Sequence, residues 1–103
     1  MGNDMQLFIE NEETLAREAW KQDALDLIVQ LAKTGREFTS DDLYQAGLKP
    51  APHPNMVGPL FYRAMNLGYI IPTHRVYRSK RSARRGGWIA EYVGAAHMMN
   101  QAA

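Results

Sequence analysis

The chain has 103 residues, 46% of them hydrophobic and 22% charged, and a formal net charge of +1, which is the profile of one ordinary globular domain. The absence of cysteine excludes a disulfide framework and cysteine-based zinc sites, and it is typical of a reducing compartment. No apolar run approaches the roughly 20 residues that span a membrane, and the first ten residues lack the order of a secretory signal, so we expect a cytoplasmic protein without a membrane segment.

The charges are divided unevenly along the chain. Residues 1–42 hold ten acids and four bases, a balance of −6, whereas residues 43–103 hold one acid and eight bases, a balance of +7. Such a split indicates a face that binds a polyanion. The alternative is a chance segregation of solvated charge.

Residues 1–10 are expected to form an N-terminal arm. A helix is expected over residues 11–34, because Asn11 is a suitable N-cap and apolar residues recur at helical spacing. These apolar residues are Trp20, Ala24, Leu27, Ile28 and Leu31. A second apolar set, nearly opposite to the first, consists of Leu25, Val29 and Ala32. The helix is therefore either the central helix of the domain, wrapped by other elements, or the carrier of a homodimer contact.

A short second helix is expected to start after Thr39. With Thr39 as N-cap, Asp42 falls at N3 in a variant of the capping box, and Phe38 and Leu43 occupy the positions of a hydrophobic staple. Glu37 and Phe38 are expected to form a brief strand edge before this helix. A stiff link with three prolines, residues 48–54, follows it.

A third helix is expected over residues 55–66, with Asn55 as its cap. Its apolar stripe comprises Val57, Leu60, Phe61, Ala64 and Leu67. The opposite face has no acid and offers amide, phenol and guanidinium groups, from Asn55, Tyr62, Arg63 and Asn66. These are groups that bond to base edges and phosphates, although a merely polar solvent face is the alternative.

Two strands are expected at residues 68–73 and 88–93, with Trp88, Ala90 and Tyr92 on the packed side and Glu91 on the other. Six bases lie between them within eleven residues: Arg75, Arg78, Lys80, Arg81, Arg84 and Arg85. Like charges in one loop repel one another, so such a cluster indicates contact with a polyanion. A solubilising loop, the alternative, usually mixes both signs.

Catalytic and metal-binding residue types do not occur at recognisable spacings. His53, His74 and His97 have no second ligand at metal spacing, no serine has a base and an orienting acid at a known spacing, and there is no glycine-rich phosphate loop. We therefore expect no enzyme, no cofactor, no metal and no small-molecule substrate. His53 and His74 flank the expected nucleic-acid face, where they can contact phosphates.

Residues 37–93 resemble the winged helix-turn-helix family, and in particular the small winged-helix proteins encoded by bacteriophages. The residues that carry the resemblance are FTSDDLYQAGL, then PHPNMVGPLFYRAMNLGYI, then a basic loop closed by two glycines. The resemblance implies an α+β fold with a three-helix core and a C-terminal β-hairpin wing over residues 11–93. Residues 94–103 are expected to be a flexible C-terminal tail or a weak terminal helix.

In this family the third helix enters the major groove, and the wing, here residues 74–87, contacts the backbone or the minor groove. The resemblance thus implies binding of double-stranded DNA in the host cytoplasm, by a phage transcription regulator or a recombination or replication accessory factor. The DNA-binding residues that the resemblance implies are Asn55, Tyr62, Arg63, Asn66, Arg75, Arg78, Lys80, Arg81, Arg84 and Arg85. His53 joins them as a candidate because it flanks the same face. The alternative is a protein-interaction winged helix that docks on host machinery through its first helix.

Overall fold

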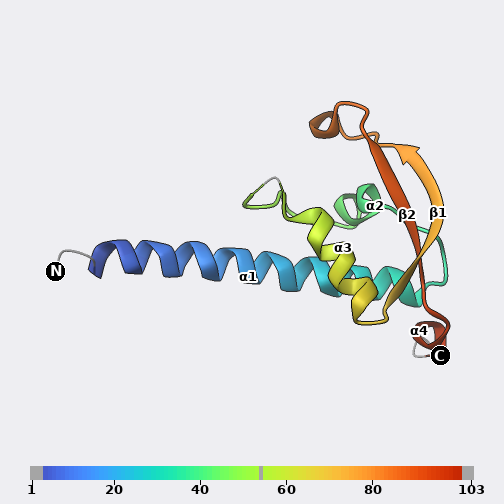
Figure 1. Ribbon diagram of the computed structural model, residues 1–103, viewed down its shortest axis with the longest axis horizontal. Coiled ribbons are helices and arrows are strands. Elements are labelled where there is room, and N and C mark those ends of the chain that lie inside the picture. Colours follow the sequence, from blue (N-terminus) through green and yellow to red (C-terminus); the bar gives the residue numbers. More distant parts are fainter. Residues whose placement is uncertain (1–3, 54, 101–103) are drawn as a thin grey trace.

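The computed structural model describes residues 4–53 and 55–100, and it shows a small α+β fold of four helices, short ones included, and one two-stranded antiparallel hairpin. The elements in chain order are α1 (Asp4–Lys33), α2 (Ser40–Gln45), α3 (Val57–Asn66), β1 (Ile70–Arg78), the 3-10 helix η1 (Ser82–Arg84), β2 (Trp88–Gly94) and α4 (Ala96–Asn100). Figure 1 shows that α1 is the axis of the molecule, with the other elements gathered around its C-terminal half.

The first helix is longer than the sequence indicated. It begins at Asp4, so the N-cap predicted at Asn11 is wrong, and residues 4–10 continue the helix instead of forming an arm. Its 30 residues span about 45 Å. Because its N-terminal half projects, the radius of gyration of 15.8 Å exceeds the value of about 13 Å typical of a compact domain of this size. Within the described part of the chain, no helix combines the length and the apolar character needed to cross a membrane.

The core forms where the C-terminal half of α1 is surrounded by the rest of the chain. Trp20, Ala24, Ile28 and Ala32 recur every four residues along α1 and are buried. They belong to one cluster with Leu43 of α2, with Leu60, Phe61 and Ala64 of α3, and with Ile70 and Met98. Of the second apolar set, Ala32 is fully buried and Leu25 and Val29 pack against this cluster, so in this half α1 is the central helix of the fold.

A close approach between β2 and α1 shapes the end of the chain. A Cβ placed on Gly94 would lie 2.9 Å from the Cα of Ala32 and closer still to its carbonyl oxygen, so no side chain fits there. After Gly94 the chain turns into α4, where Met98 is only 2% exposed. Of the two expectations for this segment, the terminal helix is confirmed over Ala96–Asn100 and the flexible tail is wrong there, because Met98 belongs to the core. Residues 101–103 lie outside the described range.

The start of α2 confirms the expected capping box. The Asp42 carboxylate accepts the Thr39 backbone N–H at 2.7 Å, and the staple residues Phe38 and Leu43 are both buried. Phe38 also exchanges two backbone hydrogen bonds of 2.8 Å with Tyr92, which confirms the strand edge expected there.

The third helix begins later than predicted, at Val57 with Met56 as its N-cap, and not at Asn55. Pro59 therefore sits in the first turn, where its missing N–H breaks no helical hydrogen bond. Of the apolar stripe, Leu60, Phe61 and Ala64 are buried as expected and Val57 is half-buried, whereas Leu67, which follows the last helical residue, is 46% exposed.

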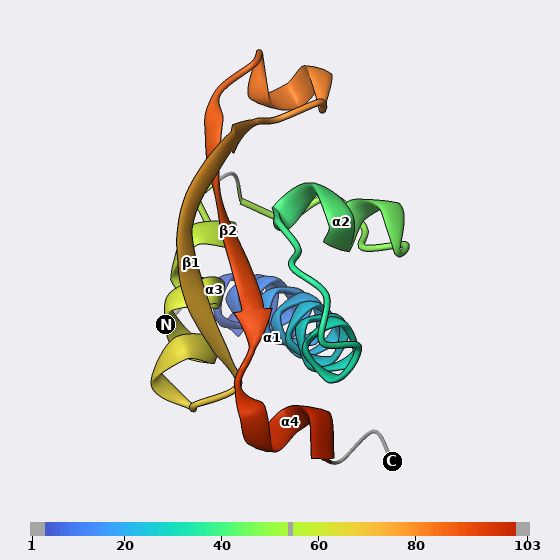
Figure 2. The same ribbon diagram turned by 90° about the vertical axis from the view of Figure 1, so that its right-hand side faces the viewer.

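The hairpin is strongly curved because β1 carries a bulge. Residues 73–75 face the single residue Glu91, between the pairs Pro72–Tyr92 and Val76–Ala90, and His74 in the bulge has a φ of 68°. Figure 2 shows the resulting bend of the two strands. The strand nevertheless resumes and runs to Arg78, so the strand end predicted at residue 73 is wrong, and Arg75 and Arg78 lie on a strand and not in a loop.

At its base the hairpin packs on α3. Tyr92 stacks on Phe61 with ring centroids 4.7 Å apart. Towards the tip the predicted packed side is wrong: Trp88 is 58% exposed and Ala90 is exposed, whereas the alternating residues Ile89 and Glu91 are buried. Glu91 does not mark a solvent face either, since it is 7% exposed and bonded to the bulge.

Candidate nucleic-acid interface

The connection between the two strands, residues 79–87, is called the hairpin tip below, and it is bound to α2 by one carboxylate. Asp41 Oδ1 accepts the Ser79 hydroxyl at 2.7 Å, and Asp41 Oδ2 accepts the Lys80 backbone N–H at 2.8 Å. Ser79 is buried, and its N–H donates to the Gly87 carbonyl at 2.8 Å, which closes the base of the tip. The tip is therefore fixed to the helical body instead of extending freely from the strands.

The backbone within the hairpin tip is folded. Residues of η1 form one turn, with Arg84 N–H bonded to the Arg81 carbonyl at 3.0 Å and Gly87 N–H bonded to the Arg84 carbonyl at 2.9 Å. Arg85 then adopts the left-handed conformation, with a φ of 51°, and Gly86 follows with a φ of 73°. Consequently the spacing of the cations along the tip is set by the fold.

Five cations lie at the tip and on the adjoining strand end. The Arg81 guanidinium stacks 3.3 Å above the Tyr44 ring of α2, and Arg84 donates to the Trp88 carbonyl at 3.0 Å. Arg78 lies 4.8 Å from the centroid of the Trp88 ring. Among the side chains that the structure describes, Arg78, Lys80, Arg81, Arg84 and Arg85 form no ion pair with an acid.

Arg75 differs from these five because its charge is balanced. Its Nε donates to Glu91 at 2.7 Å, and Glu37 lies 3.7 Å from its Nη2. Thr73 donates its hydroxyl to the same Glu91 oxygen at 2.6 Å. Hydrogen bonds from Thr73 and then from Arg75 hold the pKa of Glu91 below its usual range, and the bond to Glu91 raises the pKa of Arg75. Arg75, which the sequence predicted to contact DNA, therefore lies in an ion-pair network on β1 and not in the hairpin tip.

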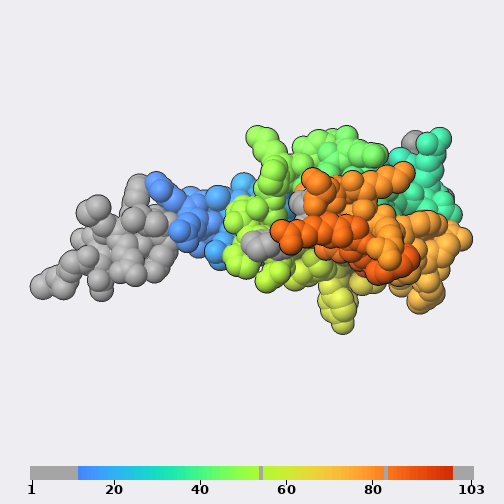
Figure 3. Space-filling view, turned by 90° about the horizontal axis from the view of Figure 1, so that it is seen from above, coloured from blue at the N-terminus to red at the C-terminus, as the bar shows by residue number. Residues whose placement is uncertain are grey.

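A groove of about 630 Å³ runs between the inner face of the hairpin and the helices, and it is called the tip groove below. Its walls include Tyr44 of α2, Asn55 before α3, and Arg81, Arg84, Trp88 and Ala90 of the hairpin. Figure 3 looks onto this side of the molecule, with the hairpin in orange beside the link and the start of α3 in light green. The fold therefore brings Asn55 to the same cavity as two of the predicted basic residues.

The remaining predicted residues of α3 lie in a second groove, of about 770 Å³, between α3 and α1. Tyr62, Arg63 and Asn66 line it together with Glu18, Lys21 and Gln22 of α1. All three α3 side chains are exposed, as predicted, but they face α1 and not the hairpin tip. Asn55 and Pro59 line both grooves, so the two groups of candidate residues meet at the N-terminal end of α3.

The two histidines expected beside this face occupy different places. His53 is exposed, and its Nδ1 accepts the Asn55 backbone N–H at 3.4 Å, which keeps it next to the start of α3. His74 lies in the bulge of β1, away from the tip.

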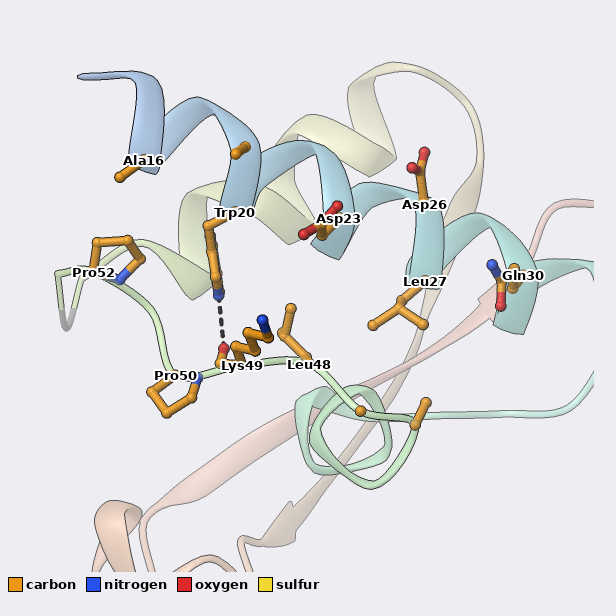
Figure 4. Close-up of a pocket in the computed structure, with 13 residues that line it drawn as sticks. Ala16, Trp20, Asp23, Asp26, Leu27, Gln30, Leu48, Lys49, Pro50 and Pro52 are labelled. Carbon is orange, nitrogen blue, oxygen red and sulfur yellow. Dashed lines mark hydrogen bonds between the residues drawn. The ribbon is translucent and has the colours of Figure 1, made fainter. Parts of the chain in front are cut away.

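A third hollow, of about 560 Å³, shows how the proline-rich link is held against α1. Trp20 Nε1 donates to the Lys49 carbonyl at 2.8 Å (Figure 4). Asp23 and Asp26 also line this hollow, and both are exposed. This part of α1 is therefore an unfavourable surface for a polyanion, in contrast to the hairpin tip.

Sequence reasoning missed Asp41 as a residue that organises the site. Its position in the first turn of α2 is a sufficient local explanation for an acid, and its partners Ser79 and Lys80 lie 38 and 39 residues further along the chain. Among the side chains that the structure describes, no three from histidine, aspartate or glutamate lie close enough together to hold a metal ion. Comparison of the chain with known protein families, with curated proteins and with solved structures finds no match.

Proposed function

We propose that the chain binds double-stranded DNA as a small winged helix, with the start of α3 towards the major groove and the hairpin tip on the backbone or the minor groove. The observation that carries the proposal is the fixed array of cations at the tip, held on α2 by Asp41 and lacking acidic partners among the described side chains. Like charges held close together disfavour folding by themselves, but they are favourable opposite phosphates.

The order of the elements supports the winged-helix part of the proposal. A long helix, a short strand edge at Phe38, two further helices and a hairpin follow one another, and the strand edge pairs with β2. Since Asn55 and Pro59 line both grooves, a duplex laid across the N-terminal end of α3 can reach both groups of candidate residues. A role as a phage regulator, or as a recombination or replication accessory factor, stays a prediction from the resemblance.

The test compares two triple variants that remove the same charge from different places. Arg81, Arg84 and Arg85 are replaced by alanine in one, and Arg17, Lys33 and Arg36, which line neither groove, are replaced in the other. Fluorescence anisotropy with a labelled blunt duplex at fixed salt measures the affinity of each. We expect the tip variant to bind at least about tenfold more weakly than the wild type, because each lost phosphate contact removes counterion release.

The control variant should bind nearly as the wild type does, since its lost charges do not face the DNA. Equal weakening of both variants would mean that net charge alone drives binding, and the proposal would be wrong. A failure of the wild type to bind duplex DNA would reject it directly.

The projecting half of α1 favours a second candidate, a contact with another protein or with a second copy of the chain. All of residues 12–19 are exposed, and Leu15 is 69% exposed. An association through this helix would survive the loss of the tip cations and would weaken on Leu15→Glu. DNA binding is expected to weaken on loss of the tip cations and to survive Leu15→Glu.

A further inference from the structure

The inner face of the hairpin presents apolar surface directly below the cationic tip. The pairs Arg78–Trp88 and Val76–Ala90 place these four side chains on the face that Tyr92 turns towards α3. Trp88 is 58% exposed and Val76 is 57% exposed, although Tyr92 further along the same face stacks on the core. An indole left uncovered in a groove that is already formed is a feature that packing of the fold does not explain.

Charge and aromatic surface coincide in this groove. Arg81, stacked on Tyr44, and Arg84, bonded at the Trp88 backbone, both line it, and none of the described residues that line it is acidic. Arg78 lies over the Trp88 ring, yet more than half of the residue stays exposed, so the indole has room for a further flat group. The volume of about 630 Å³ lies within the range of sites for small organic groups.

We propose that the tip groove takes an unpaired nucleotide of DNA, with its base against the Trp88 indole and its phosphate near Arg81 and Arg84. This inference rests on the proposed function and names the DNA that the site prefers: a duplex next to a single-stranded segment or an open base pair. A paired duplex offers phosphates but keeps its base faces stacked, so it leaves the aromatic wall unused. An unpaired nucleotide uses both, because every base has a π-face and every linkage a phosphate.

The experiment uses two probes, a short blunt duplex ended by G·C pairs and the same duplex with a short single-stranded thymine tail. Anisotropy measures the affinity, and tryptophan emission reports on the groove. The chain has two tryptophans, and Trp20 is 6% exposed and bonded to Lys49, so quenching by a base reports Trp88. We expect the tail to raise the affinity about tenfold, in line with the stacking of one base, and to quench the emission.

The substitution Trp88→Ala should remove the gain in affinity that the thymine tail gives and leave the affinity for the blunt duplex unchanged. The substitution Trp88→Phe should keep part of that gain. Ile71→Ala is the matched control, because Ile71 is 52% exposed, pairs with Val93 at the base of the same hairpin and does not line the tip groove. It should behave as the wild type does. Thermal unfolding of the Trp88→Ala protein should stay close to that of the wild type, since the residue is largely exposed.

Several results would contradict the inference. If the tail adds no affinity while the blunt duplex still binds, the proposed function stands and only the inference fails. Equal quenching by the blunt duplex would show that the groove accepts paired DNA, and equal quenching by polyglutamate would show a general site for acidic chains; either result overturns it. If neither probe binds, the proposed function fails and the inference fails with it.

Discussion

Two carboxylates, Asp41 and Glu91, help to hold the hairpin in place. Asp41 ties the tip to α2, and Glu91 collects Thr73 and Arg75 across the bulge that bends β1. Both roles depend on partners far along the chain, so a single sequence gives no sign of them. Locally, Asp41 is explained as an acid in the first turn of α2, and the alternation of β2 predicted that Glu91 faces solvent; only the first of these describes part of what the residue does.

The lowered pKa of Glu91 predicts a pH-dependent contribution to stability. Because its pKa is lower in the folded chain than in the unfolded chain, its carboxylate stabilises the fold at neutral pH, and this contribution is lost as the pH falls through the folded pKa. Glu91→Gln keeps an oxygen for Thr73 but has no charge for Arg75. The variant should therefore be less stable than the wild type at pH 7, and the difference should shrink at acidic pH, below the ordinary glutamate pKa of about 4.3.

Urea unfolding of both proteins over a pH series measures this difference. A gap between wild type and Glu91→Gln that stays constant from neutral to acidic pH would show that the ion pair with Arg75 does not contribute to the stability.

At the scale of elements, the sequence predicted what local chemistry decides. The start of α2 was found because its capping box and staple lie within six residues, 38–43. The start of α1 was missed because Asn11 is a good cap but residues 4–10 contain no proline or glycine that would stop a helix. The length of β1 and the docking of α4 were missed because they depend on Glu91 and on the contact between Gly94 and Ala32.

That last contact gives a prediction for the packing of β2 on α1. Gly94→Ala should destabilise the chain by about 2 kcal/mol or more, since the added methyl group must displace the backbone of Ala32. Gly58→Ala is the matched control: a Cβ at Gly58 meets nothing within 4 Å, and alanine is favoured over glycine within a helix, so this change should be neutral or slightly stabilising.

Denaturation midpoints of the two variants and the wild type measure the effect. If Gly94→Ala unfolds at the wild-type midpoint, then β2 does not need its close approach to α1, and the account of how the hairpin is seated on the helices is wrong.

Across the whole molecule, the uneven charge of the sequence becomes a division in space. The acids of the first part lie largely along α1, and the bases of the second part gather mainly at the hairpin tip, which Figure 1 shows above the C-terminal half of α1. The sequence predicted which residues carry this charge, and it predicted that the polar side of α3 is exposed. It could not predict that Tyr62, Arg63 and Asn66 face α1 while Asn55 joins the tip groove, because this division depends on how α3 crosses α1.

The dependence of duplex affinity on salt tests the role of the hairpin tip most directly. The logarithm of the binding constant should fall with the logarithm of salt by about 0.9 for each phosphate contact, so four or five contacts from the tip contribute a slope of roughly −4. We expect replacement of Arg81, Arg84 and Arg85 by alanine to flatten the slope by about 2 to 3 units, while replacement of Arg17, Lys33 and Arg36 leaves it unchanged. If the tip variant keeps the wild-type slope, the tip does not contact DNA and the central claim is wrong.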